Sequence, residues 1–242
     1  MESLVFFVGI IGNIISVLVF LSPVGTFWRI IRNRSTEDFE SLPYICTLLN
    51  SSLWTYYGII KPKEILVATV NGFGALVEAI YVILFLLYAP AKMRANTGFL
   101  VGILNVGFLA TAILVTRLAL EGDAGTDALG FICAGLNIIM YGSPLAAMKT
   151  VVTNKSVEYM PFFLSFALFL NGGIWTFYAF LVDDIFLGVP NGIGFLLGIA
   201  QLVLYAIYRN ANPSITTAEG ILEDGWQNES LITSSSGSYE IK

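Results

Sequence analysis

The chain has 242 residues, of which 56 % are hydrophobic and only 12 % are charged, with 17 acidic and 12 basic side chains. A soluble domain usually carries about twice that share of charge, so the excess apolar surface has to face lipid and we expect an integral membrane protein. The chain has no excess of basic residues, so the composition does not indicate nucleic-acid binding. The sequence contains no histidine, which excludes Ser-His and Cys-His triads, and we expect neither an enzyme nor a cofactor or metal site.

Seven apolar runs are long enough to cross a bilayer, which takes roughly 20 helical residues. In chain order they cover about residues 4–28, 42–60, 65–88, 98–119, 128–149, 160–181 and 185–208. The first run has no basic stretch before it, as a cleaved signal peptide would, so we expect it to be a retained span. Residues 212–242 are polar and are expected to form a disordered cytosolic tail.

Lysine and arginine are unevenly divided between the loops on the two sides of these spans. The loops after spans 1, 3, 5 and 7 carry eight of them: Arg29, Arg32, Arg34, Lys92, Arg94, Lys149, Lys155 and Arg209. The loops on the other side carry Lys61, Lys63 and Arg117. Because basic loops stay in the cytosol, we expect a non-cytosolic N-terminus and a cytosolic C-terminus.

An internal repeat relates the two halves of the chain. An offset of 121 residues brings Pro23 onto Pro144 and Trp54 onto Trp175, and an offset of 120 brings Asn71 onto Asn191. Each repeat has three spans, at 4–88 and 128–208, and the span at 98–119 links them. Because the repeats start four spans apart, they run parallel, and the fold is expected to be all-α, with two parallel three-helix bundles. Such repeats build transporters with a site between them near the midplane.

The repeated motifs resemble those of the SWEET family of sugar facilitators over about residues 5–210. The resemblance rests on WTYYG (54–58), VNGFG (70–74), PNGIG (190–194), SVEYMPF (156–162) and a proline in spans 1 and 5. The stretches SSLWTYYGI (51–59) and LNIIMYGSPLAAMKTVV (136–152) look most like the vacuolar, hexose-handling plant members. The resemblance implies passive, bidirectional uniport of fructose or glucose by alternating access, in the vacuolar rather than the plasma membrane. Sugar and the lipid bilayer are the implied partners, and a homo-oligomer is expected.

The candidate sugar site consists of repeat-related pairs of side chains. An amide inside an apolar run must face a polar partner or a watery cavity, and two tryptophan rings can stack on the C–H faces of a sugar. Residues one turn before the tryptophans share their helix face, and further pairs in spans 1 and 5 are related by the same offset. The ten candidates are Asn71, Asn191, Trp54, Trp175, Asn50, Asn171, Ser16, Val19, Asn137 and Met140.

Charged and proline residues at the two ends of the spans are the candidates for gating. We expect Tyr57, Lys61 and Asp184 to form an outer gate across the pore, with the adjacent Asp183 as the alternative to Asp184. The resemblance implies a cytosolic hinge formed by four prolines, which are Pro23, Pro43, Pro144 and Pro161. Of these, Pro23 and Pro144 are expected inside helices, where each frees the carbonyl four residues back.

Two other kinds of protein fit part of the pattern. The first is a proton-coupled amino-acid transporter of the PQ-loop type, but the dipeptides here are Pro23-Val24 and Pro144-Leu145 rather than Pro-Gln. The second is a seven-helix receptor, which a duplicated three-helix unit disfavours. Glu78 is the one acid well inside a span, and a structural role is favoured for it over proton coupling.

Overall fold

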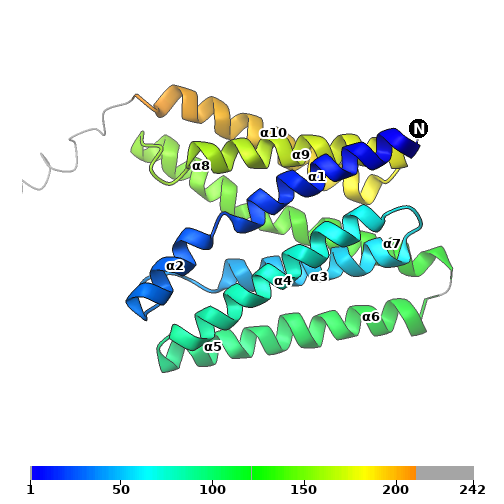
Figure 1. Ribbon diagram of the computed structural model, residues 1–242, viewed down its shortest axis with the longest axis horizontal. Helices are drawn as coiled ribbons and strands as arrows, with labels where there is room; N and C mark the ends of the chain where they lie inside the picture. The colour runs from blue at the N-terminus through cyan, green and yellow to red at the C-terminus, as the bar shows by residue number, and fades with distance from the viewer. Residues whose placement is uncertain (1, 121, 211–242) are drawn as a thin grey trace, which may run out of the picture.

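The computed structural model describes residues 2–120 and 122–210, so the predicted tail at 212–242 lies outside the described residues. Within the described part, every regular element is helical. The elements are α1 (Glu2–Leu21), α2 (Val24–Asn33), α3 (Leu42–Ile60), α4 (Ile65–Tyr88), α5 (Ala91–Val101), η1 (Gly102–Phe108), α6 (Leu109–Leu118), α7 (Asp123–Met140), α8 (Gly142–Asn154), α9 (Phe162–Val182) and α10 (Ile185–Tyr208). They run roughly alongside one another along the long axis of the molecule (Figure 1).

Six helical segments among the described residues are long and apolar enough to cross a membrane. They are Glu2–Asn33, Ile65–Tyr88, Ala91–Leu118, Asp123–Asn154, Phe162–Val182 and Ile185–Tyr208. The seventh span is α3, which has a similar length but carries five hydroxyl and amide side chains between Thr47 and Thr55. Its neighbours α4, α7 and the linker helix cover it, so its polar side chains do not have to face lipid. The multi-pass, all-helical fold expected from the sequence is therefore confirmed.

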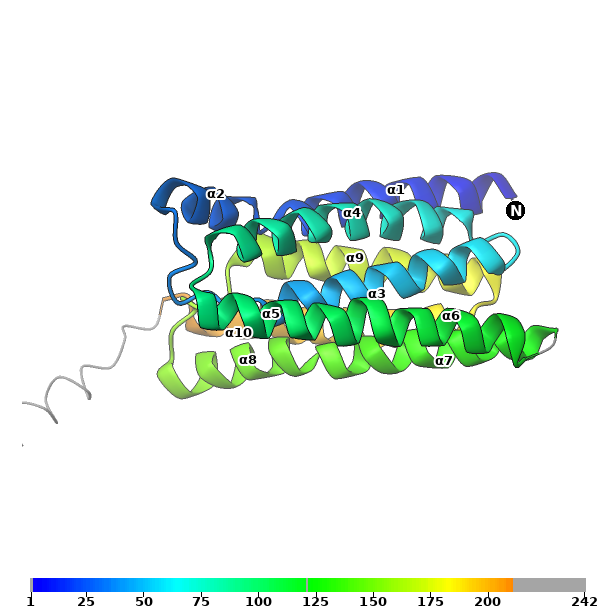
Figure 2. The same ribbon diagram turned by 90° about the horizontal axis from the view of Figure 1, so that it is seen from below.

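Each repeat packs its three spans in the same order. The third helix lies between the other two, so α4 contacts both α1 and α3, and α10 contacts both α7 and α9. Between the repeats, α1 packs on α9 and α7 packs on α3, which are equivalent pairs under the repeat. The segment α5–η1–α6 runs along α3 and α7 (Figure 2). The two bundles therefore contact each other through two equivalent pairs of helices.

Three of the seven spans have the predicted bounds, and the other four differ. Helices α3, α4 and α10 cover 42–60, 65–88 and 185–208 as expected. The linker helix begins at Ala91 rather than at 98, because the polar stretch 91–97 continues the helix instead of forming a loop. It contains the π-helical segment η1, from which the Asn105 side chain donates to the Ile45 carbonyl of α3 (3.3 Å). Side-chain packing of this kind is not visible in a hydropathy pattern.

The prediction that Pro23 lies inside a helix was wrong, and Pro144 lies inside one but near its start. Pro23 lies between α1 and α2, and Pro144 is in the first turn of α8. Because proline lacks an N–H and collides with the carbonyl four residues back, a new helical segment starts next to each of them, at Val24 and at Gly142. The carbonyl of Val19 is also not free, since it accepts the Ser22 N–H (3.1 Å).

The second glycine of each Asn-Gly-x-Gly motif lets the first span of its repeat approach the third. A Cβ atom on Gly74 would collide with the Phe20 ring, and one on Gly194 would lie 2.7 Å from the Tyr141 hydroxyl oxygen. Phe20 and Tyr141 are themselves equivalent at the offset of 121. The Tyr141 hydroxyl also donates to the carbonyl of Pro190 (2.5 Å). The glycines thus fix the distance between the helices that carry the candidate site.

Candidate functional site

A cavity of about 450 Å³ lies between the two repeats. Its volume falls within the range of about 300–1,000 Å³ that is typical of small-molecule sites. Nine of the ten predicted sugar-binding residues line it: Ser16, Val19, Asn50, Trp54, Asn71, Asn137, Asn171, Trp175 and Asn191. The tenth, Met140, is not among the lining residues. The chain bends after α7 ends at Met140, and the next residue, Tyr141, lines the cavity instead.

The two motif asparagines have the same local geometry in both repeats. The Asn71 side chain donates to the carbonyl of Val67 (2.9 Å), and the Asn191 side chain donates to the carbonyl of Leu187 (2.8 Å). Both amides are half-buried and border the cavity. An amide has two N–H donors and one carbonyl acceptor, so each keeps a donor and an acceptor for a ligand.

The two tryptophans form matching aromatic pairs with tyrosines one turn further along their helices. Trp54 packs edge-on against Tyr57, and Trp175 packs edge-on against Tyr178, each pair with its ring centroids 5.2 Å apart. Both tryptophans border the cavity. Such contacts hold the rings in fixed orientations, and a flat ring held in place is a stacking surface for a ligand.

The polar contacts between the repeats are not symmetric. On one side, the Trp175 ring N–H donates to the Ser16 hydroxyl (2.9 Å), which in turn donates to Oδ1 of Asn171 (2.6 Å). The equivalent residues on the other side include Asn50, whose Oδ1 is buried and has no hydrogen-bond partner within the described residues. A buried oxygen without a hydrogen-bond partner costs about 1–3 kcal/mol. A hydrogen bond donated to Asn50 Oδ1 would therefore be stabilising on this side of the cavity.

The three predicted outer-gate residues meet in one buried cluster. The Tyr57 hydroxyl donates to Oδ2 of Asp184 (2.8 Å), and Lys61 Nζ lies 2.6 Å from that hydroxyl and 2.9 Å from Oδ2. The other oxygen of Asp184 accepts the amide N–H groups of Phe186 (2.9 Å) and Leu187 (3.2 Å) and caps α10. The Asp184 side chain is fully buried, so the two repeats are latched together at this end.

Comparison with known proteins identifies the family. The family model described as "Sugar efflux transporter for intercellular exchange", MtN3_slv, matches residues 6–93 and 127–212, one match for each repeat. The chain belongs to the MtN3/SWEET family. It is 62 % identical to the bidirectional sugar transporter SWEET17 of Arabidopsis thaliana over 95 % of each chain, and 62 % identical to SWEET16 of the same plant over 92 % of this chain and 97 % of that one.

A solved structure supports the same family through its fold. The structure of a eukaryotic SWEET transporter superposes with a TM-score of 0.82 at 38 % identity and covers 86 % of this chain and 98 % of that one. Members of the family are sugar transporters rather than enzymes, in agreement with the absence of a catalytic pattern in the sequence.

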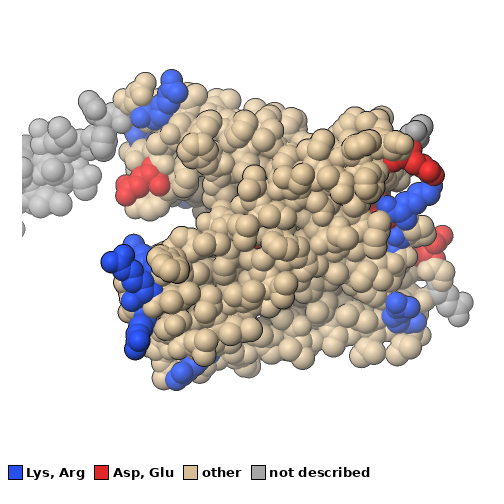
Figure 3. All heavy atoms as spheres, in the orientation of Figure 1, with Lys and Arg blue, Asp and Glu red and all other residues tan. Residues whose placement is uncertain are grey.

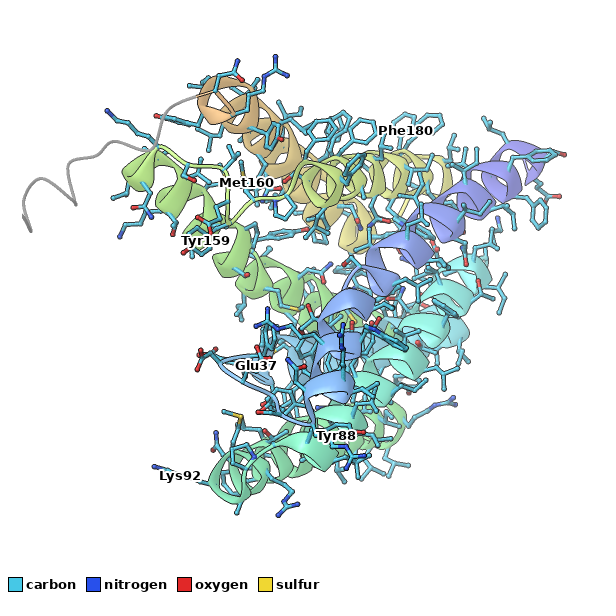
Figure 4. All side chains as sticks on the ribbon, turned by 60° about the vertical axis from the view of Figure 1, so that its left-hand side comes forward. Glu37, Tyr88, Lys92, Tyr159, Met160 and Phe180 are labelled. Carbon is cyan, nitrogen blue, oxygen red and sulfur yellow. The ribbon has the colours of Figure 1, made fainter. Side chains whose placement is uncertain are left out.

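The end of the molecule opposite the cluster of Tyr57, Lys61 and Asp184 is open. Tyr159, Met160 and Pro161, from the connection between α8 and α9, border the cavity together with Pro144. The surface is indented at this end (Figure 3). In Figure 4, Tyr159 and Met160 lie beside the second repeat, and Glu37 lies opposite them on the first. The structure therefore has one closed and one open end.

The four predicted hinge prolines lie near this open end, but they do not form one symmetric set. Pro144 and Pro161 line the cavity, whereas Pro23 borders a separate apolar groove on the side of α1 and α9, which Pro161 also borders. Pro43 is the second residue of α3, and Pro161 immediately precedes α9. Because α9 starts 120 residues after α3 and Pro161 lies two positions earlier than Pro43 relative to its helix, an offset of 118 relates the two prolines.

Some residues of the site were missed by the sequence analysis. Polar lining residues that it did not name are Thr47, Ser51, Tyr141, Ser143, Tyr159, Ser165 and Gln201. No periodic or repeated signal marks most of them. Tyr178 and Glu64 are different, because they are the repeat equivalents of the gate residues Tyr57 and Asp184. Applying the offsets of 121 and 120 to the gate would have found both.

Proposed function

We propose that this protein carries hexoses, fructose or glucose, passively and in both directions across a membrane by alternating access. The observation that carries the proposal is the position of the cavity. It lies between two repeat-related Trp–Asn pairs, directly beneath a latched outer gate, and it continues to the cytosolic end. In this conformation a sugar would exchange with the cytosol alone.

The site suits weak binding of a small polar ring. Trp54 and Trp175 offer flat apolar faces, and Asn71 and Asn191 offer donors and acceptors at the same depth. A dissociation constant near 1 mM corresponds to only about −4 kcal/mol, which a few hydrogen bonds and two stacking contacts supply. Weak binding favours a facilitator because a tightly held sugar would leave slowly.

Release to the other side requires the latch at Asp184 to open and the cytosolic end to close. The bends at Pro23 and at Tyr141–Pro144 divide the first span of each repeat into two helices. We propose that the cytosolic halves, α2 and α8, swing about these bends while α1 and α7 keep their contacts with the other repeat.

Flux measurements in liposomes test the function. Purified protein should equilibrate labelled fructose or glucose across the bilayer with equal pH on both sides, and a panel of sugars would define the substrate. Uptake that requires a proton gradient would instead support the rival PQ-loop type of proton-coupled transport. Against that rival, Glu78 is buried in α4 and is not among the residues that line the cavity.

We further propose the location, orientation and assembly of the protein. Placement in the vacuolar membrane rests on the stretches 51–59 and 136–152, which look like the vacuolar hexose-type members of the family. A cytosolic C-terminus is supported by the basic residues at the end of the molecule that carries α2, α5 and α8 (Figure 3). A homo-oligomer follows from the resemblance alone, and cross-linking in native membranes would test it.

A further inference from the structure

A second acidic residue is buried beside Asp184 at the outer gate. Glu64 lies in the turn between α3 and α4, at the N-cap of α4, and is only 1 % exposed. Its Oε2 atom is buried and has no hydrogen-bond partner within the described residues. At the offset of 120, Glu64 is the repeat equivalent of Asp184, which is the N-cap of α10.

The tyrosine beside Glu64 is also the repeat equivalent of the tyrosine that donates to Asp184. Tyr57 of the first repeat donates to Asp184 of the second. At the equivalent position, the hydroxyl of Tyr178 in the second repeat lies beside Glu64 of the first and donates to the carbonyl of the neighbouring Lys63 (3.2 Å). Each repeat thus extends a tyrosine to the acid-bearing turn of the other, with Trp54 and Trp175 packed against the two tyrosines, but only Tyr57 donates to the acid side chain itself.

The two buried acids differ in their charge partners. Lys61 is the cation of the cluster, and its Nζ lies 2.9 Å from Asp184, which it neutralises. The groups around Glu64 are Asp184 from α10, Lys61 from its own turn, Tyr178 from α9 and Tyr57 from α3, while Cys133 of α7 faces Asp184. Two carboxyl groups and one ammonium group thus share one buried site. An unpaired buried carboxylate is strongly unfavourable, so one carboxyl should hold a proton.

We propose that Glu64 is the proton-binding site of the outer gate, and that closing the gate takes up one proton from the non-cytosolic side. In the closed gate, Glu64 holds the proton beside the Asp184 carboxylate, whose two oxygens already accept from Tyr57, Lys61 and the N–H groups of Phe186 and Leu187. When the gate opens, water reaches Glu64 and the proton returns to the same compartment. The inference rests on the proposed alternating-access transporter and extends it to the regulation of its gate.

The difference between the pKa of Glu64 in the closed gate and in the open gate determines how pH changes gate closure. Burial, and next the charge of Asp184, raise the pKa of Glu64 to about 7 in the closed gate, although Lys61 and the Tyr178 hydroxyl act against this. In the water-filled open gate the group should titrate near its usual value of about 4.3. The closed state binds more protons between these values. This proton binding stabilises the closed state relative to the open state. The stabilisation is complete below about pH 4.3 and is lost as the pH rises through about 7. Over that range the closed-to-open ratio falls by up to about tenfold per pH unit.

This proton would regulate transport without driving it. Glu64 is not among the residues that line the sugar cavity, so the closed gate gives its proton no described route through the cavity to the cytosol. An acidic non-cytosolic compartment would therefore hold the outer gate shut and slow sugar entry from that side. Passive equilibration of the sugar would still end at equal concentrations.

The distance across the gate can be measured without any sugar. Ile59 and Ile185 are exposed residues beside the gate on opposite repeats, and both can be replaced by spin-labelled cysteines in a chain with Cys46→Ser and Cys133→Ala. In nanodiscs, lowering the pH from 8 to 5 should increase the population at the short, closed distance. A distance distribution that is the same at pH 5 and pH 8 would overturn the proposal.

Two variants assign the titration to Glu64. Glu64→Gln cannot ionise, so its gate should stay as closed at pH 8 as the wild type is at pH 5. Asp183→Asn removes an exposed acid one residue from the gate and should titrate like the wild type. The proposal fails if Glu64→Gln still titrates or if Asp183→Asn abolishes the titration.

A milder change covers the case in which Glu64→Gln does not fold. Tyr178→Phe removes a hydroxyl that stabilises the ionised form of Glu64, so the midpoint of the titration should move to higher pH. An unchanged midpoint would count against Glu64 as the titrating group. Because these measurements contain no sugar, they stand even if the liposome assay shows that hexoses are not the substrate.

Discussion

At the scale of single residues, Asn71 and Asn191 provide the closest link between structure and transport. Replacing either with alanine removes a donor and an acceptor from the cavity, and about 1.4 kcal/mol of lost binding is a tenfold loss in affinity. We predict that hexose flux in liposomes falls at least about tenfold in each variant. The Asn96→Ala change, at an exposed position on α5, is the matched control and should leave flux unchanged. Normal flux in both cavity variants would remove these amides from the site.

Tyr57 permits a test of the latch that leaves all charges in place. Its hydroxyl contacts both Lys61 Nζ (2.6 Å) and Asp184 Oδ2 (2.8 Å), so Tyr57→Phe deletes two hydrogen bonds without changing the shape of the ring. We predict a shift toward the open outer gate, seen as a longer mean distance between spin labels at 59 and 185. Tyr88→Phe, at the far end of α4, should show the wild-type distance at the same pH.

At the scale of helices, one glycine determines how closely two spans of the first repeat can pack. A Cβ atom on Gly58 of α3 would lie 2.5 Å from the backbone nitrogen of Ala68 and 2.8 Å from the Glu64 carbonyl oxygen, both in or next to α4. Backbone atoms cannot rotate away, so Gly58→Ala must separate the helices at a cost of about 1–3 kcal/mol. We predict a clearly lower melting temperature in detergent.

Gly72, which also lies inside a helix, provides the control for Gly58→Ala. A Cβ atom there would meet only the Thr55 side chain, at 3.8 Å, which is an ordinary contact. Gly72→Ala should therefore keep or slightly raise the melting temperature, because alanine is the better helix former by about 1 kcal/mol. If both alanine variants melted alike, the close approach at Gly58 would not limit stability.

The helix boundaries divide into those that the sequence reveals and those that it does not. The turns at 61–64 and 183–184 carry charges between apolar runs, so the ends they define, of α3, α4 and α10, were predictable. The bend before Val24 depends on which proline interrupts a span so that a new helix begins after it. The early start of the linker at Ala91 depends on helix continuity through a polar stretch. Neither depends on hydropathy, and both were misplaced.

At the scale of the whole molecule, the proposed orientation can be read from chemical accessibility. Lys63 and Arg94 are both exposed, the first in the turn between α3 and α4 and the second on α5 at the opposite end. With a cytosolic C-terminus, a membrane-impermeant maleimide applied to intact vacuoles should label Arg94→Cys but not Lys63→Cys. The wild type is the control for Cys46 and Cys133. The opposite labelling pattern would reverse the orientation.

Most of the candidate site was predictable because its residues recur at a constant offset. Each pair of lining residues, such as Asn71 and Asn191, is visible in the sequence through its constant offset. What the offset cannot reveal is a break in the symmetry. The structure places Met140 off the cavity although its equivalent, Val19, lines it. It also gives Ser16 two hydrogen bonds in the wall of one interface, which the sequence pattern does not predict for one side only.

The single lysine among the gate carboxyl groups has a consequence for how such a protein can be built. In an assembly of two identical three-helix units, every ionisable group at the gate would occur twice, so the number of charged groups there would be even. Glu64, Asp184 and Lys61 make an odd number. Joining the two units in one chain allowed the turn after α3 to keep a cation while the shorter turn after α9 has none in its place. Covalent duplication thus permits a gate that keeps one acid unneutralised, which no pair of identical subunits can do.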